Sequence, residues 1–352
     1  MRMPMHSFAF IDLFAGIGGF HQAAVQLGGK CVFASEIDVE ARRAYSANYN
    51  LRPHGDITTV STDDIPDHDA LFAGFPCQPF SIIGSRLGFD DIRGTLFFEI
   101  ARILEKKRPR VFVLENVKQL KTHNDGKTLA TIIQTLENLD YYVKWKILNA
   151  LDYGLPQKRE RIIIVGFIDK NVNFEFPQKQ EMRKLETILE PDKNVDPKFF
   201  ASEYITKKRR ERHVSKHYPS IWHENKGGNI SSYPYSCALR AGASHNYLLV
   251  NGTRRLTPRE MLRLQGFSDD FKIVCTDSQT RKQAGNAVPV DMIAAVLKKV
   301  LDIDSQAKKQ AGGHPGRLCD LAMNEPTYRA ANRGRKLCAG HSRIGTAAQR
   351  LL

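Results

Sequence analysis

Residues 8–20, FAFIDLFAGIGGF, join an apolar run to a glycine-rich turn. The run at 8–13 predicts a buried β-strand, and the residues that follow the glycines, 19–27, predict a helix. Glycines let the backbone approach a ligand closely, and a helix N-terminus favours carboxylate or phosphate groups. This combination is typical of nucleotide-binding enzymes, but taken alone it does not identify one.

The same alternation of strand and helix continues over the first 170 residues. Short apolar segments predict strands at 8–13, 31–35, 69–73, 111–115, 142–148 and 161–167. Helical patterns lie between them, among them 19–27, 38–48, 95–106 and 127–139. The alternation predicts a doubly wound, mostly parallel α/β sheet, in which ligands bind at the carboxyl ends of the strands.

The chain is expected to divide into four segments. Residues 1–170 would form the catalytic and ligand-binding domain. A smaller, loop-rich domain would follow at 171–253, where basic, aromatic and loop-forming residues interleave. Regular structure resumes over 254–303, where Thr257 is a helix N-cap followed by Pro258 and Glu260. Residues 304–352 lose all periodicity and are expected to be a disordered or extraneous tail.

Composition narrows the class of partner. The 352 residues carry a net charge of +14, which favours a polyanion such as nucleic acid, although half of that charge lies in the tail. No apolar run approaches the length of a membrane span. The six cysteines are scattered and form no C-x-x-C pair, so neither a metal site nor a disulfide framework is predicted. A reducing cytoplasm fits this cysteine usage best.

A cysteine stands between two prolines in LFAGFPCQPFS, residues 71–81. An apolar run ends just before it, so Cys77 is expected at a rigid turn at a strand end. A free cysteine is more often simply packed in a core, and the segment alone does not decide between the two. In VLENV, 113–117, Glu115 ends another apolar run, where a carboxylate is costly unless it is paired or functional. In PQKRERIIIVGF, residues 156–167, Arg159 and Arg161 stand at alternate strand positions and are expected on one face.

Two further acids follow predicted strands. Glu36 follows the second predicted strand, where an acid can bind both hydroxyls of a ribose. Asp56, in GDIT, could cap the loop after a third edge and face an adenine amine. Each acid taken singly is more often a cap or a surface charge. Together with the glycines they describe a nucleoside pocket, and because no lysine follows the glycines the turn is not a phosphate-binding P-loop.

Taken in order, these segments resemble the DNA (cytosine-5)-methyltransferases. The resemblance covers about residues 8–303 and is closest to the short bacterial type II modification enzymes of the HhaI type. The motifs that carry it are DLFAGIGGF, GFPCQPFS, ENV, QKRER, RRLTPREMLRLQGF and QAGNAVP. The family implies a Rossmann-like methyltransferase fold with a target-recognition domain at 171–253 and S-adenosyl-L-methionine as the methyl donor.

The resemblance also implies site residues. Cys77 would add to C6 of a flipped-out cytosine, Glu115 would hold N3 and the exocyclic amine, and Arg161, with Arg159 beside it, would support the base. The cofactor-binding residues would be Phe14, Ala15, Gly16, Ile17, Gly18, Glu36, Ile37, Asp56, Ile57, Pro76, Leu96, Asn286, Ala287 and Val288. The DNA-binding residues would be Gln78, Ser81, Ile83, Arg86, Asn229, Ser232, Tyr235 and Arg240. Ala238 replaces the threonine that usually precedes leucine in this family's recognition segment, so one phosphate contact is expected to be missing.

The partner implied is double-stranded DNA, with a restriction endonuclease paired in function but not bound. We expect a monomer. A tRNA cytosine-C5 methyltransferase would share every catalytic motif, although the basic segment at 171–250 favours duplex DNA. A non-catalytic DNA-binding regulator is disfavoured because Cys77, Glu115 and Arg161 are all present. A nucleotide-dependent oxidoreductase would leave the PCQ and ENV motifs unexplained.

Overall fold

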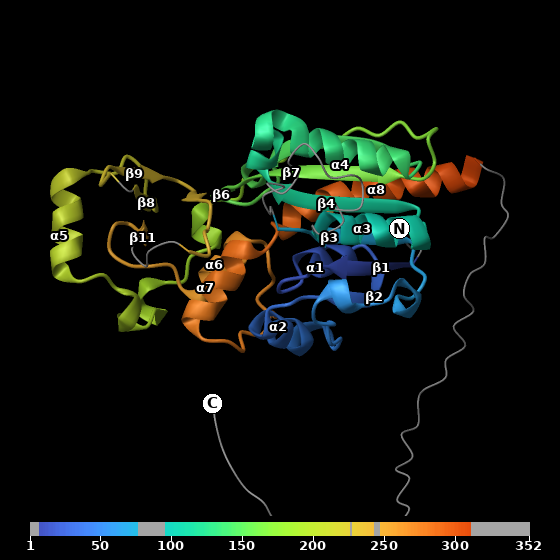
Figure 1. The fold of residues 1–352 in the computed structure, drawn as a ribbon. Coiled ribbons are helices and arrows are strands. Elements are labelled where there is room, and N and C mark those ends of the chain that lie inside the picture. Colours follow the sequence, from blue (N-terminus) through green and yellow to red (C-terminus); the bar gives the residue numbers. More distant parts are fainter. Residues whose placement is uncertain (1–6, 77–95, 226, 243–246, 311–352) are drawn as a thin grey trace, which may run out of the picture. The chain divides into compact units, whose positions relative to one another are not determined.

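The computed structural model of the chain describes residues 7–76, 96–225, 227–242 and 247–310 (Figure 1). These ranges belong to one compact unit, which spans residues 1–312. Cys77 and four of the predicted DNA-binding residues, Gln78, Ser81, Ile83 and Arg86, lie outside the described residues. Most of the predicted tail lies outside them too.

A six-stranded sheet forms the centre of this unit. Its strands are β1 (Phe8–Leu13), β2 (Gly29–Ser35), β3 (Ala70–Gly74), β4 (Val111–Val117), β5 (Tyr142–Asn149) and β7 (Glu160–Phe167). They lie in the order β2-β1-β3-β4-β7-β5, and β7 alone runs opposite to the other five strands. The predicted mostly parallel, doubly wound sheet is therefore confirmed, and each strand begins and ends within two residues of its predicted bounds.

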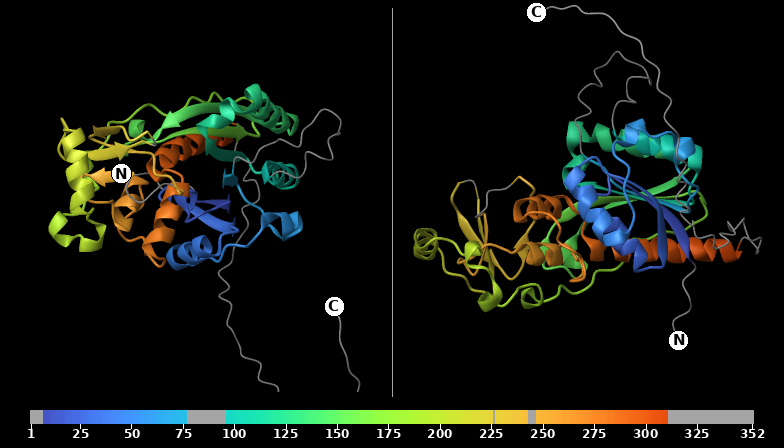
Figure 2. Two further views of the ribbon diagram at one scale, coloured as in Figure 1. Left: turned by 60° about the vertical axis from the view of Figure 1, so that its left-hand side comes forward. Right: turned by 90° about the horizontal axis from the view of Figure 1, so that it is seen from below.

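Helices cover both faces of the sheet (Figure 1 and Figure 2). Helices α1 (Gly19–Val25) and α8 (Val290–Gln310) cover one face, and α3 (Leu96–Lys107) and α4 (Lys127–Asn138) cover the other. Side chains of β4 alternate between the two cores, because successive residues of a strand point to opposite faces. Val111 and Val113 pack in the first core, while Phe112 and Leu114 pack in the second. Helix α2 (Val39–Tyr49) follows β2.

The carboxyl ends of β1, β2, β3 and β4 lie at the same edge of the sheet. Leu13 of β1 pairs with both Ser35 and Ala73, and Gly74 of β3 pairs with Glu115 of β4. The chain order reverses direction between β1 and β3, which is where α/β sheets bind ligands. Because β7 is antiparallel, its first residues reach this same edge.

Residues 171–253 contain a three-stranded antiparallel sheet of β8 (Ile221–Glu224), β9 (Ile230–Tyr233) and β11 (Leu248–Val250). They also contain helix α5 (Glu203–Arg212), where the sequence predicts no helix. Ser202 caps α5 by accepting a hydrogen bond from the Ile205 N–H, and buried Arg209 binds Glu224 of β8 at 2.7 Å. These partners, rather than an apolar stripe, fix the helix.

The chain then returns to the six-stranded sheet. The short strand β10 (Ser236–Cys237) pairs with β6 (Gln157–Lys158), which lies just before β7. Helix α6 (Pro258–Leu264) starts with the predicted Thr257 cap, completed as a capping box by Glu260, and α7 (Asp277–Asn286) follows. Helix α8 continues to Gln310, six residues past the predicted start of the tail. Within the described ranges, no helix is long and apolar enough to cross a membrane.

The packing at Gly166 of β7 gives a test of the fold. A Cβ atom added there would overlap the Phe112 ring of the neighbouring strand, so we expect Gly166→Ala to lower the free energy of unfolding by about 1–3 kcal/mol. Urea denaturation measures the change. In the control, Gly242→Ala, the added Cβ has no atom within 4 Å, and an equal loss in both variants would contradict the packing described.

Candidate active site

The glycine-rich turn after β1 lies at the edge of the sheet where the strands end. Phe14, Gly16 and Gly18 all have positive φ, at 54°, 56° and 85°. The N–H of Ala15 donates to the Ser35 carbonyl at 2.9 Å, which fixes the turn against the end of β2. A Cβ on Gly16 would meet nothing within 4 Å, whereas one on Gly18 would overlap Tyr49. Gly18 is therefore required by packing, and Gly16 leaves free space for a ligand.

Glu36 links this turn to β2. One carboxylate oxygen accepts the Gly16 N–H at 2.8 Å and the other accepts the Asp38 N–H at 2.8 Å. Ile37 beside it is 70% exposed, which is unusual for so large an apolar side chain. An exposed isoleucine next to a fixed carboxylate suits a ligand that has both a ribose and an apolar ring.

The other predicted cofactor residues meet the same edge. The backbone N–H of Glu36 donates to the His54 carbonyl, so the segment that contains Asp56 and buried Ile57 is tied to the end of β2. Val288 packs against Gly19 and Gly74, so the segment 286–288 lies between the turn and the end of β3. The remaining residues lie as follows: Ala287 is buried, Asn286 and Pro76 are exposed, and half-buried Leu96 begins α3.

Asp12, near the end of β1, is a buried acid that the sequence reasoning missed. It is 1% exposed, and among the described residues neither carboxylate oxygen makes a hydrogen bond of good geometry. Burial raises the pKa of Asp12 well above its usual value; the nearby His21 N–H opposes this rise, and the charge of Glu36 adds to it. Asp12 and Glu36 therefore flank the glycine turn, and the Glu36 carboxylate favours a cation there. The residues thus fit S-adenosyl-L-methionine, which carries a sulfonium, an ammonium and a ribose.

Glu115 and Arg161 form an ion pair at the end of β4. Arg161 Nε lies 2.8 Å from Glu115 Oε1, and the side chains are 15% and 9% exposed. Burial raises the pKa of Glu115, and the charges of Arg161 and then Arg159 act against this rise. Asn116 donates to the Phe75 carbonyl at 2.9 Å, so the backbone two residues before Cys77 is tied to β4.

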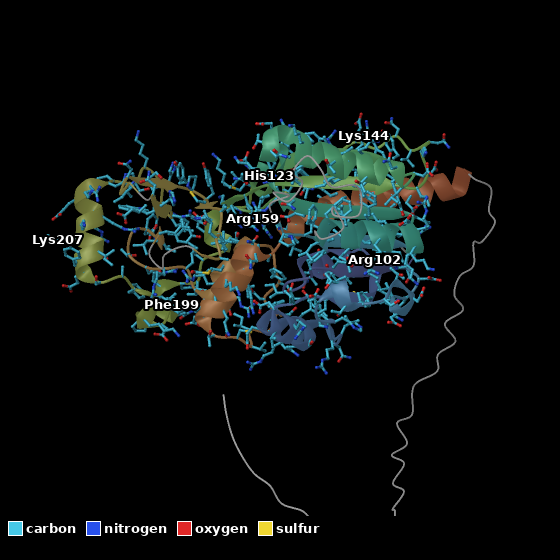
Figure 3. The ribbon with its side chains drawn as sticks, in the orientation of Figure 1. Arg102, His123, Lys144, Arg159, Phe199 and Lys207 are labelled. Atoms are coloured by element: carbon cyan, nitrogen blue, oxygen red, sulfur yellow. The ribbon has the colours of Figure 1, made fainter. Side chains whose placement is uncertain are left out.

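The Arg159 guanidinium binds backbone carbonyls of distant segments. Strand β6 ends at Lys158 and β7 begins at Glu160, so Arg159 is the single residue that joins them. It is 1% exposed, and its guanidinium donates to the carbonyls of Leu239, Gly285 and Ala287 at 3.2, 3.2 and 2.8 Å. In Figure 3 it lies between the six-stranded sheet and the part of the chain that holds α5.

Comparison with known proteins identifies this arrangement. A profile of C-5 cytosine-specific DNA methylases matches residues 8–302. The chain belongs to that family. It is 56% identical to the type II methyltransferase M.NgoBI of Neisseria gonorrhoeae over 290 residues, covering 82% of this chain and 91% of the relative. To M.HhaI of Haemophilus parahaemolyticus it is 40% identical over 308 residues, covering 83% and 93%.

The fold is also shared with more distant proteins. A crystal structure of a DNMT2 variant from Spodoptera frugiperda matches 84% of this chain and 99% of that one, with a TM-score of 0.65 at 20% identity. The chain is therefore a DNA (cytosine-5)-methyltransferase with a Rossmann-like catalytic fold, and S-adenosyl-L-methionine is its methyl donor.

The methyltransferase presents its described DNA-binding candidates on the part that contains β8–β11. Asn229 is exposed in the hairpin between β8 and β9, and Tyr235 stacks on Tyr233 with ring centroids 5.1 Å apart. The Ser232 hydroxyl is already hydrogen-bonded to His213 at 2.8 Å. Asn229 and Arg240 are thus more available to a ligand than Ser232.

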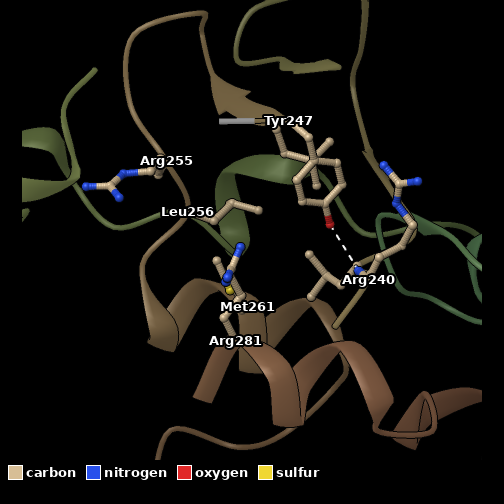
Figure 4. A pocket seen from close by; sticks show the side chains of 8 residues that line it. Arg240, Tyr247, Arg255, Leu256, Met261 and Arg281 are labelled. Atoms are coloured by element: carbon tan, nitrogen blue, oxygen red, sulfur yellow. Dashed lines mark hydrogen bonds between the residues drawn. The ribbon is translucent and has the colours of Figure 1, made fainter. Parts of the chain in front are cut away.

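Arg240 borders a small pocket (Figure 4). Its guanidinium lies over the Tyr247 ring, 4.9 Å from the centroid, and its backbone N–H donates to the Tyr247 hydroxyl. Arg255 and Arg281 also line the pocket. The pocket lies beside residues 239–240 rather than beside Glu36 or Glu115, and five of its eight lining residues are apolar or aromatic.

The buried acid Asp12 generates a prediction. Its raised pKa means that its contribution to stability is complete below about pH 4, the usual aspartate pKa, and is lost as the pH rises through the folded-state value. Asp12→Asn should therefore match the wild-type protein at low pH and exceed it at high pH by about 1–3 kcal/mol. Urea denaturation from pH 4 to pH 9 tests this expectation, and a difference that stays constant with pH would contradict it.

Proposed function

We propose that this methyltransferase modifies C5 of a flipped-out cytosine in a short duplex site, through a transient bond between Cys77 and C6. The observation that carries the proposal is the buried Glu115–Arg161 pair at the sheet edge, aligned with Gly74, three residues before Cys77. A carboxylate kept there against the cost of burial fits a catalytic role. Duplex bases are stacked, so the target must leave the helix to reach a buried acid.

The chemistry assigns each residue a step. C5 of cytosine is a weak nucleophile, and addition of the Cys77 thiolate to C6 moves electron density onto N3 and C5. Glu115 holds N3 and the exocyclic amine and stabilises the charge that develops there. Bound S-adenosyl-L-methionine supplies the methyl group that C5 accepts. Loss of the C5 proton and elimination of the thiolate from C6 then restore the aromatic ring and free the enzyme.

The environment of Glu115 supports this assignment. Its raised pKa brings the carboxyl group closer to neutrality than an exposed glutamate, so it can share a proton with N3. Arg161 fixes the orientation of the carboxylate through Oε1 and leaves Oε2 for the base. We propose Arg161 as a catalytic residue, and Arg159 acts through backbone contacts instead.

The residues around the glycine turn are proposed as the cofactor site. Glu36 would bind the ribose, Ile37 would pack on the adenine, and Asp56 with Ile57 would contact its edge. The turn residues Phe14–Gly18, together with Pro76, Leu96 and Asn286–Val288, would enclose the rest. The DNA contacts would come from Asn229, Ser232, Tyr235 and Arg240, with Gln78, Ser81, Ile83 and Arg86 from outside the described residues.

The setting is inferred from the relatives. M.NgoBI and M.HhaI are type II methyltransferases, which suggests that this enzyme protects DNA in a restriction–modification system. The paired endonuclease would not be bound, and we propose a monomer acting on a short GC-rich site in the cytoplasm. The cysteines at 31, 237 and 275 are free, as a reducing compartment requires. The alternative substrate, tRNA, receives no support from the family profile.

The covalent step can be trapped directly. Bisulfite sequencing of DNA from cells that express the enzyme maps the target site. A duplex of that sequence with 5-fluorocytosine at the target should then remain covalently joined to the protein, because fluorine cannot leave as the proton does. Cys77→Ala should give no adduct on a denaturing gel. An adduct in that variant would refute the proposal, and methyl transfer to tRNA but not DNA would establish the alternative.

Substitution of the two acids Glu115 and Glu36 separates catalysis from binding of the methyl donor. Glu115→Gln should lower kcat by about 10²–10⁴-fold and leave the KM for the methyl donor nearly unchanged. Glu36→Gln removes a carboxylate from the proposed ribose site, so it should raise the donor KM and change kcat little. Steady-state kinetics with tritiated donor measures both. A change in donor KM for Glu115→Gln and a change in kcat for Glu36→Gln would contradict both assignments.

A further inference from the structure

We propose that Arg159, supported by Gln157, is a positioning residue that couples the DNA-recognition segment at 236–241 to the cofactor segment at 285–288. The inference rests on the proposed roles of those two segments. Arg159 holds both segments at once, and Gln157 holds Leu239 of the first segment against Leu264 at the end of α6.

Gln157 binds the recognition segment to the end of α6. Its Oε1 accepts the backbone N–H of Leu239 at 3.0 Å, and its Nε2 donates to the Leu264 carbonyl at 2.8 Å. The residue is 0% exposed, so water cannot replace either bond. Leu239 lies directly before Arg240, a proposed DNA-contacting residue.

Arg159 binds the same residue from its carbonyl side. One terminal nitrogen donates to the Leu239 carbonyl, and the other donates to the carbonyls of Gly285 and Ala287. One planar guanidinium thus bridges the recognition segment and the cofactor segment. Burial lowers the pKa of Arg159 to about 9, which still leaves it charged at neutral pH, so all of its bonds are charge-assisted.

The two segments also touch directly. A Cβ placed on Gly285 would lie 2.5 Å from the Ala241 nitrogen and 2.9 Å from its Cα, so the end of α7 packs on the recognition backbone with no side chain between them. Three residues further on, Val288 packs against Gly19 and Gly74 at the cofactor turn. A displacement of Leu239 would therefore either break buried hydrogen bonds or move the 285–288 segment with it.

This geometry predicts linkage between the two ligands. If duplex binding fixes the recognition segment, it also fixes the wall of the cofactor site, and donor affinity rises by the same factor by which the donor raises DNA affinity. A role confined to fold stability would lower the unfolding free energy and leave that factor unchanged. The factor is therefore the quantity to measure.

The test uses Arg159→Lys in the full-length enzyme. A lysine ammonium cannot span carbonyls on both segments, because its donors radiate from one atom. Isothermal titration gives the dissociation constant of S-adenosylhomocysteine with and without the duplex whose site bisulfite sequencing has mapped. We expect the duplex to tighten binding to the wild-type enzyme and expect this gain to fall by about fivefold or more in the variant.

Arg254→Lys is the matched control. Arg254 is also 1% exposed and multiply bonded, to Asp192, Glu260 and the Glu190 carbonyl, but it contacts neither segment. The Arg254→Lys variant should be less stable, and the duplex should still increase its affinity for S-adenosylhomocysteine as much as in the wild type. The proposal would be overturned if the duplex increased the affinity for S-adenosylhomocysteine equally in the wild type and Arg159→Lys. It would also be overturned if both variants lost this increase equally.

A second measurement requires no variant to fold. In the wild-type enzyme, S-adenosylhomocysteine alone should slow hydrogen exchange at the amides of 238–241, which lie outside the proposed cofactor site. Unchanged exchange there, in a protein that binds the compound, would overturn the coupling. Absence of cytosine methylation by the wild type would instead refute the proposed function, so the two failures are distinguishable.

Discussion

The antiparallel direction of β7 is the constraint on which the site depends. Its pairing with β4 places Arg161 opposite Val117 and brings its guanidinium to Glu115 at 2.8 Å. A parallel strand in this position would bring its carboxyl end here and its first residues to the far edge of the sheet. Because the strand is reversed, the short segment that leads into it also reaches the active edge. Gln157, Arg159 and Arg161 can therefore act within one stretch of five residues.

Burial of charge distinguishes this edge from the rest of the sheet. Glu115 has Arg161 to offset part of the cost, whereas Asp12 has no comparable partner among the described residues. An unpaired buried acid lowers stability, and a protein folded for stability alone would not need one. The acids near the glycine turn suit a cationic methyl donor, and exposed Arg240, whose guanidinium lies over the Tyr247 ring, suits a polyanion. The two substrates are thus separated by the sign of the charge that receives them.

Much of this was predictable because the signals are local. Strand ends agree with the sequence since glycines and prolines terminate the apolar runs, and the Thr257 cap needs only residues three apart. Helix α5 was missed because its stability comes from Glu224, fifteen residues beyond Arg209. The direction of the Arg159 side chain was missed because its acceptors lie 80 to 128 residues away. Asp12 was overlooked because nothing in its local sequence distinguishes it from a strand-end acid.

The coupling contacts share a chemical property that bears on specificity. Arg159 binds carbonyl oxygens, and Gln157 binds an N–H and a carbonyl, so their partners are backbone groups that nearly every residue type offers. Side chains in the recognition segment can therefore differ without loss of the contacts that hold it. Its two connections to the sheet, through β6 and through α7, meet at the same guanidinium. An enzyme built in this way can change the sequence that it reads and keep the distance between the recognised base and the methyl donor.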